Sequence, residues 1–169
     1  MASTHPDFVD LDASSMSDAE MLKYLQDNIV PATRTLNGEF LELDSKRGVS
    51  RCRFKIVPSF CHSQGTICQG GFLTGMVDIA MANAALVKER FTCAVPTLEL
   101  KVSFFEPVGL GHAIAEGRVL RWGGSVGSLE GELRDEQGKL AVHATCTVKI
   151  VRPKKAYATG MRRSTPGRI

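Results

Sequence analysis

The sequence contains few of the features that would place it in a well-known class at once. Its five cysteines (Cys52, Cys61, Cys68, Cys93 and Cys146) are an odd number and form no C-x-x-C pair. This pattern argues against a disulfide framework and a zinc knuckle, and it suits a reducing cytosol. No P-loop or Rossmann fingerprint occurs, which disfavours common nucleotide-binding folds. Residues 123–127 do read G-x-S-x-G, but they fall at a predicted turn between two strands. A nucleophile elbow needs a strand-to-helix turn, so a Ser-His-Asp hydrolase is disfavoured. We expect a cytoplasmic protein with no metal and no cofactor.

Long apolar runs and secretory signals are also missing from the pattern. No run approaches the ~18 apolar residues that cross a membrane, and the N-terminus has no basic region followed by an apolar core. The net charge of +3 is mild, and much of the positive charge falls in residues 153–169, which is typical of a solvated, flexible tail. The sequence therefore predicts no membrane insertion and no nucleic-acid partner.

The length of 169 residues predicts one domain with short extensions. Residues 1–16 are polar and irregular, so we expect a flexible N-terminus. Ser17 and Glu20 have the spacing of a capping box, and apolar residues follow at helical intervals until Pro31. We therefore expect an N-terminal helix within residues 17–37.

Alternating apolar and polar residues predict strands on both sides of one long apolar segment. Leu41 and Leu43 alternate with acids, and residues 51–56 alternate between apolar and basic side chains. A turn at residues 46–48 joins these two stretches in a predicted hairpin. Four further strands are predicted at residues 98–104, 112–121, 127–134 and 140–150. Their short connections imply an antiparallel meander.

The long apolar segment, residues 70–88, lacks period-two alternation. Its alanines favour a helix, and Gly75 leaves room for close packing. Because the segment is apolar nearly all round, we expect a buried helix. The order of elements over residues 38–152 predicts an α+β fold, in which an antiparallel sheet wraps around one long central helix and the N-terminal helix is an addition.

The start of this helix carries the most informative residues. A glycine-rich turn ends in Gly70 and Gly71, and one carboxylate, Asp78, follows Gly71 after seven residues, or about two helical turns. A carboxylate in an apolar helix is costly to bury without a partner. Asp78 is therefore a candidate functional residue, although many buried acids are only structural.

Four pieces of sequence, in this order, resemble one known family. They are Gln69-Gly70-Gly71 with Asp78, the strand from Thr97 to Pro107, the turn glycines Gly111 and Gly123, and the hairpin Asp135-Glu136-Gln137-Gly138-Lys139-Leu140-Ala141. Over roughly residues 38–151 the chain resembles the hotdog fold. More narrowly, it resembles the acyl-CoA thioesterases related to phenylacetate-pathway and 4-hydroxybenzoyl-CoA thioesterases. The resemblance implies hydrolysis of an acyl- or aryl-CoA thioester to free acid and CoA.

The resemblance also implies roles for the motif residues. Asp78 would act as general base on water or as nucleophile on the thioester carbonyl. The backbone N–H of Gly70 would face the thioester oxygen at a helix N-terminus. Gln69 stands where many relatives have His, so it can donate a hydrogen bond to a carbonyl but cannot shuttle a proton. The active site would form between subunits of a homodimer or homotetramer.

The loop before the glycines leaves one partner ambiguous. Members of this family often carry an Asn about six residues before the position that corresponds to Gln69. That position is Ser63 when counted back from the paired glycines, and His62 when aligned on Gly65-Thr66. Histidine side chains ordinarily change charge near neutral pH, which makes His62 the more interesting of the two, and both residues are candidate catalytic groups.

Other candidates follow from position in the family pattern. Thr97 aligns with a hydroxyl that helps to position water or the carboxylate. A later turn lies where relatives contact the pantetheine arm or the nucleotide. The candidate substrate-binding residues are Gly71, Thr74, Gly123, Gly124 and Ser125. Basic residues that could meet CoA phosphates are Arg121, Arg152 and Lys154.

Other functional classes remain open at this point. A non-catalytic hotdog protein could bind acyl-CoA as a sensor or scaffold, but the N-terminal part is too short for a helix-turn-helix and Asp78 favours an enzyme. A hotdog dehydratase or hydratase usually presents a His with the acid, which Gln69 does not supply. A Cys nucleophile at Cys61 or Cys68, close to His62, lacks a protease-like local signature.

Overall fold

The computed structural model describes residues 15–152, so the expected flexible tail at 153–169 and nearly all of the expected flexible N-terminus at 1–16 lie outside the described residues. The helices are α1 (Asp18–Asp27), α2 (Pro31–Thr35) and α3 (Gly70–Lys88), with a short 3-10 helix η3 (Pro58–Phe60). The strands are β1 (Gly38–Asp44), β2 (Val49–Ile56), β3 (Cys61–His62), β4 (Ile67–Cys68), β5 (Thr97–Phe104), β6 (Gly111–Trp122), β7 (Val126–Arg134) and β8 (Leu140–Lys149).

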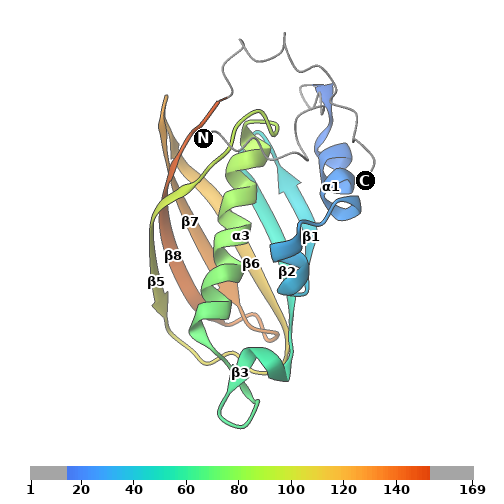
Figure 1. The fold of residues 1–169 in the computed structure, drawn as a ribbon, viewed down its shortest axis with the longest axis vertical. Helices are drawn as coiled ribbons and strands as arrows, with labels where there is room; N and C mark the ends of the chain where they lie inside the picture. The colour runs from blue at the N-terminus through green and yellow to red at the C-terminus, as the bar shows by residue number, and fades with distance from the viewer. Residues whose placement is uncertain (1–14, 153–169) are drawn as a thin grey trace, which may run out of the picture.

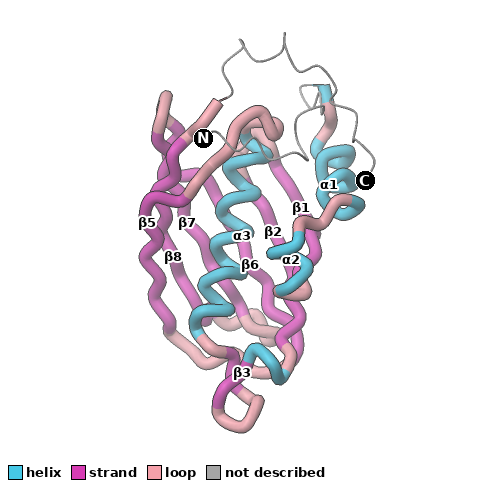
Figure 2. Tube along the Cα trace, in the orientation of Figure 1, coloured by secondary structure: helices cyan, strands magenta, loops and turns pink. Residues whose placement is uncertain are grey.

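Six strands form one antiparallel sheet in the order β1-β2-β6-β7-β8-β5. The sheet curves around α3 (Figures 1 and 2), so the predicted α+β fold with one central helix is confirmed. The predicted meander is right for β6, β7 and β8 and wrong for β5. Because β2 and β7 occupy both edges of β6, β5 pairs instead with the free edge of β8.

The N-terminal segment contains two helices where the sequence predicts one. The Ser17 hydroxyl accepts the Glu20 N–H at 3.3 Å, and the Glu20 carboxylate accepts the Ser17 N–H at 2.7 Å, so the predicted capping box is present. α1 then ends at Asp27. Pro31 does not simply interrupt the first helix but begins α2, because the first turn of a helix does not need the N–H that proline lacks.

One strand departs from the predicted alternation. The register of β1 against β2 shifts between Phe40 and Glu42. Phe40 and Leu43 are buried, whereas Leu41 is exposed. A bulge of this kind sets two residues of one strand against one residue of its partner, so it reverses the alternation that the leucines predicted.

α3 is the buried helix that its composition predicts, with nine buried residues among its 19. By length and composition it is also long and apolar enough to cross a membrane. The expectation that no apolar run approaches that length is therefore wrong. The core helix of a globular domain meets the same criterion, and here the strands of the sheet pack against α3 (Figure 1).

Two glycines let α3 lie close to the sheet. Gly117 of β6 and Gly131 of β7 are direct partners in the strand register. A Cβ added to Gly117 would lie 2.4 Å from the backbone of Ala80, and one added to Gly131 would lie 2.6 Å from Val77 Cγ2. Both distances are far shorter than van der Waals contact. Any side chain at Gly117 or Gly131 would therefore clash with α3 in its present position.

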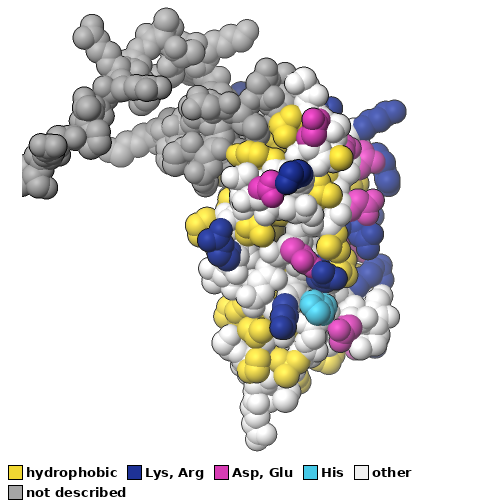
Figure 3. Space-filling model, turned by 90° about the vertical axis from the view of Figure 1, so that its right-hand side faces the viewer, with side chains coloured by type: hydrophobic (Ala, Val, Ile, Leu, Met, Phe, Trp, Pro, Cys, Tyr) yellow, Lys and Arg dark blue, Asp and Glu magenta, His cyan; other side chains and the backbone are white. Residues whose placement is uncertain are grey.

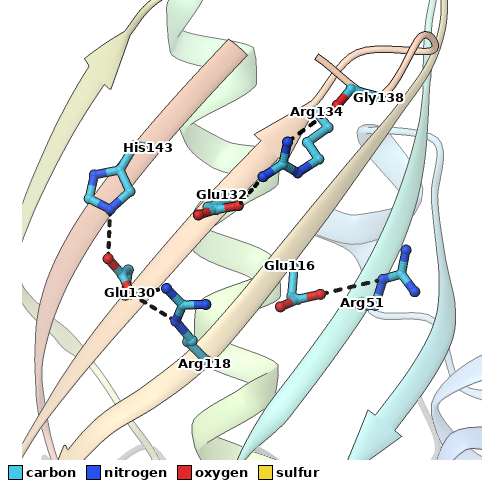
Figure 4. Close-up of polar contacts among 8 residues, drawn as sticks. All are labelled: Arg51, Glu116, Arg118, Glu130, Glu132, Arg134, Gly138 and His143. Atoms are coloured by element: carbon cyan, nitrogen blue, oxygen red, sulfur yellow. Dashed lines mark hydrogen bonds and ion pairs between the residues drawn. The ribbon is translucent and has the colours of Figure 1, made fainter. Parts of the chain in front are cut away.

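The face of the sheet turned away from α3 carries charged side chains that pair across strands (Figure 4). Arg118 of β6 contacts the Glu130 carboxylate of β7, which also contacts His143 Nε2 of β8 at 2.7 Å. Hydrogen bonds from His143 and Arg118 hold the pKa of Glu130 below its usual range. Acidic and basic side chains are also interspersed on the side shown in Figure 3. Exposed pairs contribute little stability individually, but they keep these surfaces polar.

We predict that Gly117→Ala lowers the free energy of unfolding by about 1–3 kcal/mol, as overpacking typically does, because the new methyl group meets helix backbone that cannot rotate away. Thermal unfolding followed by circular dichroism measures the effect. Gly124→Ala is the matched control, since a Cβ there meets nothing within 4 Å. Equal melting temperatures for the two variants would contradict the close packing of α3.

Candidate active site

The first N–H groups of α3 are unevenly satisfied. The Gln69 carbonyl accepts the N–H groups of Phe72 at 3.0 Å and Leu73 at 3.4 Å, and Gln69 Oε1 accepts the Gly71 N–H at 2.7 Å. Among the hydrogen bonds found within residues 15–152, none uses the Gly70 N–H. This group is therefore the first-turn donor left open to a ligand, at the helix end whose dipole favours negative charge.

Gln69 is the N-cap of α3, and several hydrogen-bonding groups at this helix start are already used within the helix. Its Oε1 is used by Gly71, so its Nε2 remains to donate to a carbonyl. The Thr74 hydroxyl donates to the Gly70 carbonyl at 2.8 Å. The structure thus brings all four predicted residues of the helix start together, but the Gly71 N–H and the Thr74 O–H are already used within the helix.

Asp78 and Thr97 are brought together by α3 and the first residue of β5. Asp78 is half-buried, and Thr97 Oγ1 donates to Asp78 Oδ1 at 3.3 Å, a long hydrogen bond for two oxygens. Burial raises the pKa of Asp78, and the Thr97 hydrogen bond partly offsets this. Burial raises the pKa of Cys146 in β8 to about 11, and the charge of the Asp78 carboxylate raises it further. The carboxylate therefore has one hydroxyl partner in a partly dry setting.

Gly70 and Asp78 of one chain lie far apart along α3. Their eight-residue separation corresponds to about 12 Å of helix axis. An oxyanion donor acts at about 2.7–3.1 Å from the oxygen, and a base acts at a similar distance from its proton donor. Two such contacts together reach about 6 Å, roughly half of that rise, so the spacing disfavours direct contact of one thioester with both groups of the same chain.

An aromatic residue that the sequence pattern did not single out lies against Gly70. A Cβ on Gly70 would be 3.1 Å from Cζ of Phe104, the last residue of β5. The Phe104 side chain is 51% exposed. Further into the helix start, Phe72 stacks on Phe60 with ring centroids 4.8 Å apart. Strand alternation alone marks Phe104 as one more inward residue, so the sequence carried no signal for its position beside the open N–H.

His62 and Ser63 lie in the β3–β4 hairpin, beyond the N-terminal end of α3 (Figure 1). Both are exposed, and His62 Nδ1 contacts Ser63 Oγ at 2.7 Å. No polar contact in the described part of the chain joins either residue to Asp78. The choice between them stays a prediction.

The turn predicted to bind substrate is anchored at the opposite end of α3. Glu89, the residue after α3, accepts a hydrogen bond from Trp122 Nε1 at 2.5 Å and from Arg152 at 2.9 Å. Burial alone would raise the pKa of Glu89, but the hydrogen bonds from Arg152 and Trp122 hold it below its usual range. Arg152 also donates to the Gly124 carbonyl at 2.8 Å.

The contacts of Glu89 with Trp122 and Arg152 hold the predicted substrate-binding turn at the C-terminal end of α3. Gly123, Gly124 and Ser125 are separated from Gly70 by the length of α3, about 27 Å for its 19 residues. One chain therefore does not bring that turn to the open N–H. Arg152, a candidate for CoA phosphates, already pairs with Glu89, and Lys154 lies outside the described residues.

Comparison with known proteins shows which family shares this sequence and fold. Residues 65–142 match the model of the thioesterase superfamily. A crystal structure from Ralstonia eutropha JMP134, of a phenylacetic acid degradation-related protein named as a candidate thioesterase, is 30% identical. The match covers 78% of this chain and 97% of that chain, with a TM-score of 0.69.

Two further relatives agree with this result. A candidate esterase of Saccharolobus solfataricus is 37% identical over 91 residues, which is 54% of this chain and 64% of that protein, so the chain spans less than two thirds of this curated relative. The Escherichia coli PaaI protein, from the phenylacetic acid degradation operon, shares the fold with a TM-score of 0.69 at 17% identity, over 79% of this chain and 94% of that one. The hotdog fold predicted from the sequence is thus confirmed, and the chain belongs to the thioesterase superfamily.

Proposed function

We propose that this protein hydrolyses acyl-CoA thioesters to a free acid and CoA, at an active site formed between two copies of the chain. The observation that carries the proposal is a pair of complementary groups on α3. The Gly70 N–H is an open donor at the positive end of the helix, and Asp78 is a half-buried carboxylate held by Thr97. The first group suits a developing oxyanion, and the second suits a base or nucleophile.

In the proposed reaction the thioester oxygen accepts a hydrogen bond from the Gly70 N–H. Gln69 Nε2 can donate to the same carbonyl, because only Oε1 of this side chain is used by the helix cap. Negative charge then develops on the oxygen next to the N-terminal end of α3, where it is stabilised most. Asp78 either takes a proton from an attacking water or attacks the carbonyl carbon itself. Collapse of the tetrahedral intermediate breaks the C–S bond and expels CoA as its thiolate. On the nucleophilic route this leaves an acyl–Asp78 anhydride, which water then hydrolyses to the free acid.

The separation of Gly70 from Asp78 supports a site that two subunits share. β5 lies at the edge of the sheet, and within residues 15–152 no strand pairs with one side of its backbone. Leu98 and Phe104 on this strand are 58% and 51% exposed. Pairing of β5 with the same strand of a second copy would satisfy that edge and cover these side chains. It would also bring Asp78 of one chain toward Gly70 of the other.

A cytosolic location is part of the same proposal. All five cysteines are free thiols, which suits a compartment where glutathione keeps thiols reduced. CoA thioesters as substrates are consistent with that setting.

We predict that Asp78→Asn reduces thioester cleavage by at least ~100-fold, as expected on loss of a base or nucleophile, and stabilises the fold at neutral pH. Burial raises the folded-state pKa of Asp78, so ionisation costs stability as the pH rises through that pKa, and Asn avoids the cost. We expect the melting temperature to rise by roughly 1–3 °C at pH 7, and the two proteins to converge below pH ~3.9, where an ordinary Asp is protonated.

Thiol release from a panel of acyl-CoAs and thermal unfolding at both pH values measure the two effects. Full activity in Asp78→Asn would contradict the assigned role. A wild-type protein that binds acyl-CoA but releases no thiol would favour a non-catalytic sensor or scaffold.

We predict that Gly70→Pro lowers kcat by about 10²–10³-fold, the usual cost of losing an oxyanion donor. Proline at the first helical position removes only the N–H and is well tolerated there, and the preceding Gln69 already has the extended backbone that proline requires (φ −71°, ψ 136°). Gly70→Ala is the matched control, because it retains the N–H and introduces the same crowding against Phe104. A Pro variant as active as the Ala variant would exclude Gly70 as the donor.

A mixing experiment tests whether the site is shared. Asp78→Asn and Gly70→Pro homo-oligomers are each expected to be inactive, but a mixed dimer would contain one site with both intact groups. After subunit exchange through dilute denaturant, we expect about a quarter of wild-type activity, because half of the dimers are mixed and each has one working site of two. No recovery, with mixed dimers demonstrated by mass spectrometry, would place both groups of a site in one chain.

A further inference from the structure

The β3–β4 hairpin sets two cysteines opposite each other directly before α3. Cys61 and Cys68 are partners in the antiparallel register, and both are free thiols, Cys68 buried and Cys61 partly exposed. Within the described sheets no other cysteine faces a cysteine. Cys52 pairs with Phe40 and Ala115, and Cys146 pairs with Leu100 and Leu129.

The backbone hydrogen bonds show which kind of pair this is. The Gln69 N–H donates to the Phe60 carbonyl at 2.8 Å, one step further along the same register. The Cys68 N–H points the other way and donates to the Val108 carbonyl at 2.8 Å. In an antiparallel ladder, hydrogen-bonded and non-hydrogen-bonded pairs alternate. Cys61 and Cys68 are therefore a non-hydrogen-bonded pair, the kind whose side chains lie closest.

This geometry falls within the range that a disulfide accepts. Non-hydrogen-bonded pairs have Cα atoms about 4.5 Å apart, and disulfides span about 4.4–6.8 Å between Cα atoms. In the dithiol form the Cys61 thiol donates to the Val57 carbonyl at 3.4 Å, and the Cys68 thiol lies 3.8 Å from the Gln69 carbonyl. Thiol hydrogen bonds are weak, so rotation of both side chains toward each other meets little resistance.

We propose that Cys61 and Cys68 form a reversible dithiol–disulfide site, which a small disulfide such as oxidised glutathione closes and which controls the position of the α3 N-terminus. Only six residues lie between the two cysteines in sequence, all of them in the β3–β4 hairpin, so closure is local to this hairpin. In a reducing compartment such a pair would stay open until the glutathione pool is oxidised.

The oxidation balances with two molecules of glutathione as products. The thiolate of Cys61, the more exposed residue, attacks one sulfur of oxidised glutathione, and the released glutathione takes up the proton that Cys61 lost. The thiolate of Cys68 then attacks Cys61 Sγ and releases the second glutathione in the same way. Burial, with a contribution from Cys61, raises the pKa of Cys68 to about 11, so closure is expected to accelerate at alkaline pH.

Closure would act on the residue that presents the open donor. Only Gln69 separates Cys68 from Gly70. Opposed Cβ atoms in non-hydrogen-bonded pairs lie near 4.5 Å apart, at the upper end of the 3.5–4.5 Å range of disulfides, whose mean is about 3.8 Å. Closure therefore draws the two strands together by up to about 0.7 Å. A displacement near 1 Å can cost about 10²-fold in rate. We therefore expect slower thioester cleavage in the oxidised form, a consequence that rests on the proposed function, while the disulfide itself does not.

The test uses the purified full-length protein incubated with oxidised glutathione at pH 7 and pH 9. Remaining thiols are then alkylated under denaturing conditions and peptides are mapped without reduction. We expect Cys61 and Cys68 to be linked, faster at pH 9, with the other three cysteines alkylated and the link reversed by dithiothreitol. Cys68→Ser is the matched variant, which should stop at a glutathione adduct on Cys61.

Cleavage of an acyl-CoA is followed in the same samples, and we expect at least a ten-fold fall that dithiothreitol reverses. A glutathione adduct on Cys61 of the wild-type protein without a linked pair would overturn the site. A linked pair with unchanged cleavage would overturn its control over α3. If the reduced protein cleaves no thioester, the proposed function fails, and the peptide map still decides whether the disulfide site exists.

Discussion

The close contact between α3 and the sheet is the constraint on which the rest of the structure depends. Gly117 and Gly131 remove side-chain volume where the helix crosses β6 and β7. The helix can then bury one side against the strands, and its carboxylate is left partly withdrawn from water. The raised pKa of Asp78 follows from this position, since desolvation penalises the charged form. The stability of the fold and the raised pKa of this acid thus have one physical origin.

Much of the fold could be predicted because each element carries a local signal. The capping box at Ser17, the alternation in the strands and the apolar run of α3 each depend on residues close in sequence. The bulge in β1 and the placement of β5 beside β8 could not be predicted. Register and strand order depend on which partner edge is free, and no single strand contains that information.

The residues of the candidate site also divide into those that local sequence predicts and those that depend on contacts in the folded chain. Gly70 and Asp78 could be identified from a glycine-rich turn and helical spacing. Thr97, which the family pattern places near the carboxylate, does contact Asp78. The use of Gln69 as a helix cap, and the commitment of Arg152 to Glu89, depend on neighbours that only the folded chain supplies. The pairing of Cys61 with Cys68 was hidden for another reason. A hairpin with two-residue strands is too short to produce a detectable alternation.

The unpaired edge of β5 has a consequence for the life of the protein in a crowded cell. Pro96 and Pro107 flank the strand, but its eight residues contain no proline, and Lys101 is its only basic residue. Such an edge can template association with any exposed strand. If a second copy pairs with this edge, the same contact would complete the proposed active site and cover an aggregation-prone strand. Evolution would then constrain these eight residues twice, and a substitution that weakens the pairing would both silence the enzyme and promote aggregation.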